Sequence, residues 1–203
     1  MTTPQNLLMI TMDETSTRRV DPADLSVALA GAELIDLLEA KAIGLDNGYL
    51  VPGRQAVPDD HCLQQAMESL HLTEPYQLVS DWLGNREDML VERYTAALET
   101  EDLATRRRPR GHPLRSREVV LVDSPAHRQA LERWASAEPV LVALAASVGI
   151  RTEQPHRSAA ETDEAVAAVL SAVEEALAGL AAEREESIIT QAKLDGLWDS
   201  YVG

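Results

Sequence analysis

A nearly continuous apolar stretch at residues 24–45 constrains the fold more than any other part of the chain. Its apolar positions are too closely spaced for a single stripe, so the pattern predicts a central helix with neighbours on most sides. Asp24 is the expected N-cap, because its carboxylate can accept an amide of the first turn. The helix is expected to run to about Ala42, and Gly31 in its first half would let another backbone approach closely. Nothing in this stretch is chemically reactive, so it predicts architecture.

The rest of the chain predicts a mainly α domain with one or two short β-hairpins. The 203 residues include three Trp, four Tyr and no Phe, so Leu, Val, Ile and Ala must form the core, which favours helix. Asn47-Gly48 between apolar residues predicts a hairpin over 43–51, and a β-branched run predicts a second one within 103–123. Further helices are predicted at 3–12, 59–70, 75–83, 86–101, 125–137, 139–150 and 161–186, with Thr3, Asp59 and Ser124 as N-caps.

The chain is long enough to bury one sizeable core. Residues 1–150 are expected to form a helical domain, and residues 151–203 a helical C-terminal portion packed on it. The apolar spacing within 161–186 is that of an amphipathic helix. A last turn is expected to pack through Leu194, Leu197 and Trp198.

Few residues suggest chemistry, and we expect a non-enzymatic cytoplasmic protein without a cofactor. Cys62 is the single cysteine, which favours a reducing compartment and a core role for its thiol. No apolar run approaches the ~18 residues of a membrane span, and no signal peptide is visible. The histidines lack metal-ligand spacing, and no nucleophile or phosphate-loop motif is present. Neither catalytic residues nor a metal site are predicted.

The most informative feature for function is an arginine-rich segment at residues 103–117. The whole chain has a net charge of −16, yet this segment carries six arginines and no acid. Its arginines are Arg106, Arg107, Arg108, Arg110, Arg115 and Arg117. Clustered basic residues beside an anionic leaflet contribute about 1 kcal/mol each, so the segment could hold the protein on a membrane. Leu114 could insert shallowly into the lipid.

A second interpretation of these arginines stays open. They could pair with acids of the protein's own surface or of another subunit, which would make the protein a scaffold that oligomerises without lipid. Nucleic acid is a poor partner, because aromatic residues are not interleaved and the remaining acidic surface would repel phosphate. A further group of basic candidates consists of Arg18, Arg19, Arg86 and Arg93.

Several stretches, taken in order, resemble the Golgi phosphoprotein family of phosphoinositide-binding adaptors. NLLMITMDE resembles the family's opening helix, and ALAGAELIDLLEAKAIGLDNG resembles its signature helix and the hairpin that follows. VPDDHCLQQAMESL, DWLGN and VLVDSPAHRQAL resemble later segments. The likeness covers roughly residues 5–150.

The resemblance implies a mostly helical fold with short β-hairpins and a peripheral membrane location. It further implies binding of phosphatidylinositol 4-phosphate on a basic face, engagement of cytoplasmic tails of membrane glycosyltransferases, and homo-oligomerisation through the hairpin. The family's lipid-site positions fall here on Asp21, Ala30, Asp88 and Val91. None of these four can attract phosphate, so the arginines named above are the candidate lipid-binding residues.

Overall fold

Helices form most of the structure. The computed structural model describes residues 1–13, 20–85, 89–107, 118–150 and 163–202, with side chains described as far as residue 191. In chain order, its elements are α1 (Thr3–Met12), α2 (Pro22–Glu39), β1 (Ile43–Asp46), β2 (Tyr49–Pro52), α3 (His61–Ser69), α4 (Val79–Gly84), α5 (Leu90–Thr100), β3 (Ala104–Arg107), β4 (Glu118–Leu121), α6 (Pro125–Ala135), α7 (Pro139–Ser147) and α8 (Glu164–Val202). The predicted mainly α fold with short β-hairpins is confirmed.

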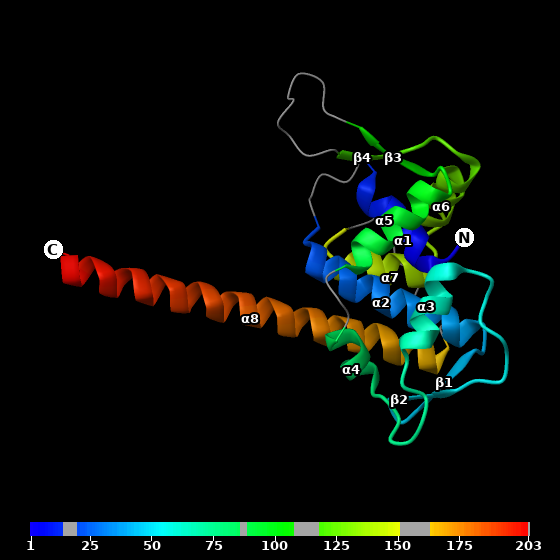
Figure 1. Cartoon of the computed structure of the whole chain (residues 1–203), viewed down its shortest axis with the longest axis horizontal. Helices are drawn as coiled ribbons and strands as arrows, with labels where there is room; N and C mark the ends of the chain where they lie inside the picture. Colours follow the sequence, from blue (N-terminus) through cyan, green and yellow to red (C-terminus); the bar gives the residue numbers. More distant parts are fainter. Residues whose placement is uncertain (14–19, 86–88, 108–117, 151–162, 203) are drawn as a thin grey trace.

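The predicted central helix is α2, which packs against α1, α5 and α8 (Figure 1). Twelve of its 18 residues are buried, on all sides of the helix. Gly31 has the role expected of a small residue, because a Cβ at this position would overlap Cγ2 of Val173 in α8. The two backbones can therefore come closer than two side chains would allow.

The predicted ends of the central helix were wrong. Its N-cap is Asp21, whose carboxylate accepts the N–H of Ala23 at 2.9 Å, and Pro22 fills the first helical position. Asp24 therefore lies inside the first turn. At the other end Lys41 adopts a φ of +56°, and the N–H of Ala42 bonds back to the carbonyl of Leu37 at 3.0 Å. This Schellman turn ends the helix before Ala42.

Both predicted hairpins are present. β1 and β2 pair in an antiparallel register around Asn47-Gly48, with φ values of +48° and +83°. These values are those of the type I′ turn that an Asn-Gly pair favours. β3 and β4 also pair antiparallel, with Arg106 opposite Val119, and the residues between the two strands lie outside the described ranges.

Two further N-caps differ from the predictions by one residue. α1 is capped by Thr2, not Thr3, and its capping side chain accepts an amide of the first turn. α3 is capped by Asp60, not Asp59, through a 2.9 Å bond from the N–H of Leu63. In both cases two neighbouring residues of the same type could serve as the cap, so composition alone does not choose between them.

α4 starts later than predicted, at Val79 instead of near residue 75, because the preceding residues pair with the first hairpin. The N–H of Leu50 donates to the carbonyl of Gln77 at 2.8 Å, which keeps that segment extended. A helix therefore begins only after this contact is made.

α8 is a single helix that continues to Val202, well beyond the predicted end near 186. Its first half packs against α2, α4 and α7, and its C-terminal part extends away from the rest of the protein (Figure 1). By length and composition alone, Glu164–Gln191 could cross a membrane. Within this stretch Val169 and Val173 are fully buried and belong to the core, whereas 22% of the window that meets these criteria is buried in all.

Candidate functional site

The β3–β4 hairpin holds the start of the arginine-rich segment beside α5. α5 ends in a Schellman turn at Asp102, with a φ of +58°, and β3 then packs back against the helix. Within β3, Nε of Arg106 lies 2.7 Å from Oε1 of Glu99 on α5, while Arg107 is exposed. Arg108, Arg110, Leu114, Arg115 and Arg117 lie outside the described residues.

The pair between Arg106 and Glu99 is a surface ion pair. The Arg106 side chain is 50% exposed and that of Glu99 is 27% exposed. Pairs of this kind contribute about 0–1 kcal/mol and are screened by salt. The pair therefore contributes little to the stability of the fold.

Of the second group of basic candidates, Arg93 is the member that the structure describes. Arg18, Arg19 and Arg86 lie outside the described ranges. Arg93 is half-buried on α5, where its charge acts on the thiol of Cys62 in α3. Burial dominates at that thiol and raises its pKa to about 11, while Arg93 lowers it slightly. Cys62 is thus an unreactive core residue.

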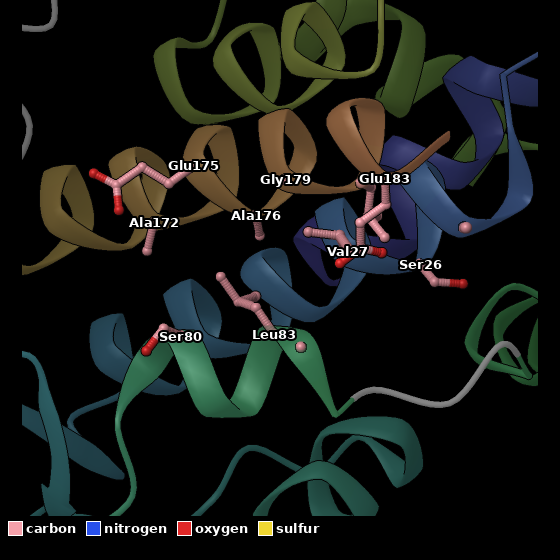
Figure 2. Close-up of a pocket in the computed structure, with 12 residues that line it drawn as sticks. Ser26, Val27, Ser80, Leu83, Ala172, Glu175, Ala176, Gly179 and Glu183 are labelled. Carbon is pink, nitrogen blue, oxygen red and sulfur yellow. The ribbon is translucent and has the colours of Figure 1, made fainter. Parts of the chain in front are cut away.

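A groove lies where α2, α4 and α8 meet (Figure 2). It encloses about 470 Å³ between the first turns of α2, the end of α4 and the middle of α8. Its lining is dominated by small and apolar residues: Ala23, Ser26, Val27, Ser80, Leu83, Gly84, Ala172, Glu175, Ala176, Gly179, Leu180 and Glu183. Glu175 and Glu183 are the ionisable members of this set, so the groove is acidic.

Beyond one end of the groove, Arg184 of α8 forms ion pairs with two aspartates at the N-terminus of α2. Its guanidinium lies 2.8 Å from Oδ1 of Asp24 and 3.2 Å from Oδ1 of Asp21. Arg184 was not predicted as a site residue from the sequence. The sequence feature that could have identified it is its position four residues after Leu180, on the stripe of α8 that packs against the protein. Its two partners, however, are 163 and 160 residues away in the chain.

Two carboxylates of α2 face the interior and serve packing. Oδ2 of Asp36 accepts the N–H of Thr3 at 2.7 Å, which ties α1 to α2, and burial raises the pKa of Asp36 to about 6. Glu33 is fully buried and accepts the hydroxyl of Tyr94 at 3.2 Å. Neither carboxylate lines the groove, and the described residues include no group of three or more His, Cys, Asp or Glu placed to hold a metal ion.

The comparison with known families now identifies this architecture. The model of the Golgi phosphoprotein 3 (GPP34) family matches residues 4–187. The chain belongs to this family. The match confirms the resemblance noted in the sequence and extends it through the first half of α8. No curated protein matches the chain. Membership of the Golgi phosphoprotein 3 family indicates an adaptor role of the Golgi-associated, peripheral kind. The family is one of non-enzymatic adaptors.

The four positions at which the resemblance predicted the family's lipid site have other roles in this chain where the structure describes them. Asp21 caps α2 and faces Arg184. Ala30 is fully buried, and its carbonyl accepts the indole N–H of Trp82 at 3.4 Å. Val91 is half-buried on α5, and residue 88 lies outside the described ranges. Asp21, Ala30 and Val91 therefore provide no cationic side chain that could bind a phosphate.

Proposed function

We propose that this Golgi phosphoprotein 3 family member is a peripheral membrane adaptor that docks on anionic phospholipid, with a phosphoinositide-like headgroup, through its arginine-rich segment. The observation that carries the proposal is six arginines without an acid within residues 103–117, in a chain of net charge −16. The hairpin supports it, because β3, at the start of the segment, packs on α5, and β4, which follows the segment, packs on α1. Both ends of the segment are therefore anchored to the core.

The expected strength follows from the charge count. At about 1 kcal/mol per basic residue near an anionic surface, six arginines supply enough attraction for reversible attachment. The acidic remainder of the protein opposes close approach, so docking through one basic segment also orients the molecule. Attachment should weaken steeply as salt rises, because the charges lie in water.

Vesicle sedimentation tests the proposal. The protein is mixed with vesicles of phosphatidylcholine alone, with added phosphatidylserine, or with added phosphatidylinositol 4-phosphate. We expect binding to both anionic vesicles and not to neutral ones, with the phosphoinositide preferred. Substitution of all six arginines by serine should abolish it.

A matched control tests whether binding depends on the arginine-rich segment itself or on the net charge of the protein. The triple substitution Arg108→Ser, Arg110→Ser and Arg115→Ser should weaken binding about 100-fold, from about 3 kcal/mol of lost attraction. The triple substitution Lys41→Ser, Arg54→Ser and Arg128→Ser removes the same charge from exposed positions elsewhere. Equal binding by the two triple variants would show that the segment is not the docking site.

The second candidate function is a scaffold that oligomerises through the same arginines. The pair between Arg106 and Glu99 lies within one chain, and it motivates this candidate because an acid of a second copy could meet the arginines in the same way. Light scattering without lipid across a salt series tests this function. Oligomers that dissociate as salt rises, and that are absent from the six-serine variant, would establish it.

A further inference from the structure

The outer face of α8 is a surface that the rest of the protein leaves uncovered. The stripe by which α8 packs on the protein includes Val173 and Leu177. On the opposite side, the exposed positions follow one another at steps of four, three and four residues and so share one face: Ala178, Ala182, Glu185 and Ile189. Of the apolar window within Glu164–Gln191, 22% is buried. Apolar surface of this extent commonly marks an interaction site.

This outer face carries two exposed isoleucines where α8 leaves the rest of the protein. Ile188 is 69% exposed and Ile189 is 48% exposed, and beyond them the helix extends away from the other elements (Figure 1). The family match ends at residue 187, whereas the helix continues to Val202. A helix of about 15 residues is only marginally stable in water without packing. We therefore expect the extension to have a partner outside its own chain.

We propose that two copies of this chain pair through the outer faces of α8, in an antiparallel arrangement centred on Ile189. The pairing covers residues 178–200, which span about 33 Å at 1.5 Å per residue. Each α8 packs on its own chain through the opposite side, so the two copies lie on the outer sides of the helix pair and do not collide. This contact involves neither lipid nor the arginine-rich segment.

The sequence along this face is complementary to itself. Beyond Ile189 the same face passes through positions 193, 196 and 200, again at steps of four, three and four. Antiparallel pairing centred on residue 189 aligns position 185 with position 193 of the second copy, and position 182 with position 196. Glu185 and Lys193 have opposite charges, and Ala182 and Gly196 are both small. The pairing therefore brings opposite charges together on both sides of the central isoleucines.

Charge also disfavours two other arrangements. Parallel pairing would align Glu185 with Glu185 of the second copy, and like charges at the same level repel each other. An anionic membrane would be repelled as well, because residues 174–186 contain five glutamates and one arginine. A second, antiparallel copy avoids both conflicts.

Sedimentation velocity over a concentration series measures this association, with the full-length protein and no lipid. We expect a reversible dimer, because a contact between two helices is small. Ile189→Asp replaces the central apolar contact by two carboxylates and should raise the dimer dissociation constant about 100-fold or more. Met89→Asp makes the same kind of change at a residue that is 57% exposed elsewhere, and it should have no effect. Circular dichroism checks that both variants keep the fold.

A charge exchange tests the antiparallel register. Glu185→Lys alone and Lys193→Glu alone should each weaken the dimer about tenfold, since each leaves two pairs of like charges. The two substitutions together restore opposite charges and should restore the dimer. Glu186→Lys combined with Lys193→Glu is the matched control, because the register aligns position 186 with position 192, and this variant should stay weakened.

Several outcomes would overturn the proposal. These are a protein that stays monomeric at every concentration, or a dimer that Ile189→Asp leaves intact. A dimer that is lost only in the six-serine variant would assign association to the arginine-rich segment. A charge exchange that fails to restore the dimer would contradict the register. Binding to neutral phosphatidylcholine vesicles that Ile189→Asp abolishes would identify lipid as the occupant of this face.

Discussion

The two sides of α2 are held by different physical means. Toward α8 the contact depends on shape, because Gly31 leaves just enough room for Val173 and the surrounding residues are apolar. Toward α1 and α5 the contact includes buried polar groups: Asp36 accepts the N–H of Thr3, and Glu33 accepts the hydroxyl of Tyr94. One helix therefore has a face sensitive to volume and a face sensitive to protonation.

This difference suggests how the molecule divides its roles. A close apolar contact fixes the position of α8, and α8 in turn forms one wall of the groove. The polar contacts fix α1, which reaches toward β4 and the base of the arginine-rich segment. Changes in volume should therefore disturb the groove first, whereas changes in pH should act on the α1 side.

The largest effect is expected on the apolar side. Gly31→Leu places a large side chain where even a Cβ would overlap Val173, a stiff and fully buried residue. We expect a loss of about 3 kcal/mol or more in the free energy of unfolding, measured by urea titration. Gly179→Ala is the matched control, since nothing lies within 4 Å of its added Cβ, and it should stabilise the helix by about 0.5–1 kcal/mol. Equal effects at the two glycines would mean that the contact between α2 and α8 is loose.

On the polar side, Asp36→Asn should change the pH dependence of stability. Burial raises the pKa of Asp36 from 3.8 to about 6 in the folded protein, although the hydrogen bonds with Thr3 lower it; Glu39 and Arg133 have smaller and opposite effects. The folded state then binds more protons than the unfolded state between about pH 4 and pH 6, so the contribution of this group falls as pH rises through that window. Asparagine keeps an acceptor for Thr3 and removes the charge. Relative to wild type, we expect the Asp36→Asn variant to gain up to about 2–3 kcal/mol between pH 4 and pH 7.

Thermal unfolding of both proteins from pH 4 to pH 8 measures this gain. The Asp36→Ala variant serves as the control, because it removes the acceptor and leaves the N–H of Thr3 without this partner. It should be less stable than the asparagine variant at every pH. A difference between wild type and Asp36→Asn that stays constant with pH would contradict the assigned burial of this carboxyl.

A smaller effect is expected at the tie between α2 and α5. Tyr94→Phe removes the hydroxyl that donates to Glu33 and leaves a fully buried carboxylate with one bond fewer. Loss of one bond to a buried group costs about 1–3 kcal/mol. Tyr49, 43% exposed on the first hairpin, supplies the control, and Tyr49→Phe should be nearly neutral. Urea titrations of the two variants compare them directly.

The same contrast explains how far the sequence could predict the fold. Apolar spacing identified α2 as the central helix, and Asn47-Gly48 identified the first hairpin, because both signals are local. The ends of α2 and α6 were predicted too late in the chain, since Lys41 and Ala137 adopt positive φ values of +56° and +54° where glycine is the usual signal. The end of α5 was predicted to within one residue, although Asp102 also adopts a positive φ of +58°. The late start of α4 also depends on a distant partner, the β2 residue Leu50.

The candidate sites also differ in whether the sequence alone could predict them. The arginine-rich segment is contiguous in sequence, so composition alone could find it. The groove needs α2, α4 and α8 side by side, and its two glutamates look like ordinary surface acids on an amphipathic helix until that packing is known. The ion pairs of Arg184 with Asp21 and Asp24 likewise join residues more than 150 positions apart.

The ion pairs of Arg184 with Asp21 and Asp24 provide the smallest predicted effect. They also test most directly whether shape or charge holds α8 against α2. Arg184→Gln removes both ion pairs, but the two aspartates remain favourable at the N-terminus of α2, where Asp21 still caps the helix. The side chains are partly exposed, so we expect a loss of about 0.5–1 kcal/mol at low salt and less at high salt. Urea titrations at both salt concentrations measure it, with Arg128→Gln, whose partner Asp123 is 82% exposed, as a control expected to change less. A loss comparable to that of Gly31→Leu would show that charge, and not shape, positions α8 on α2.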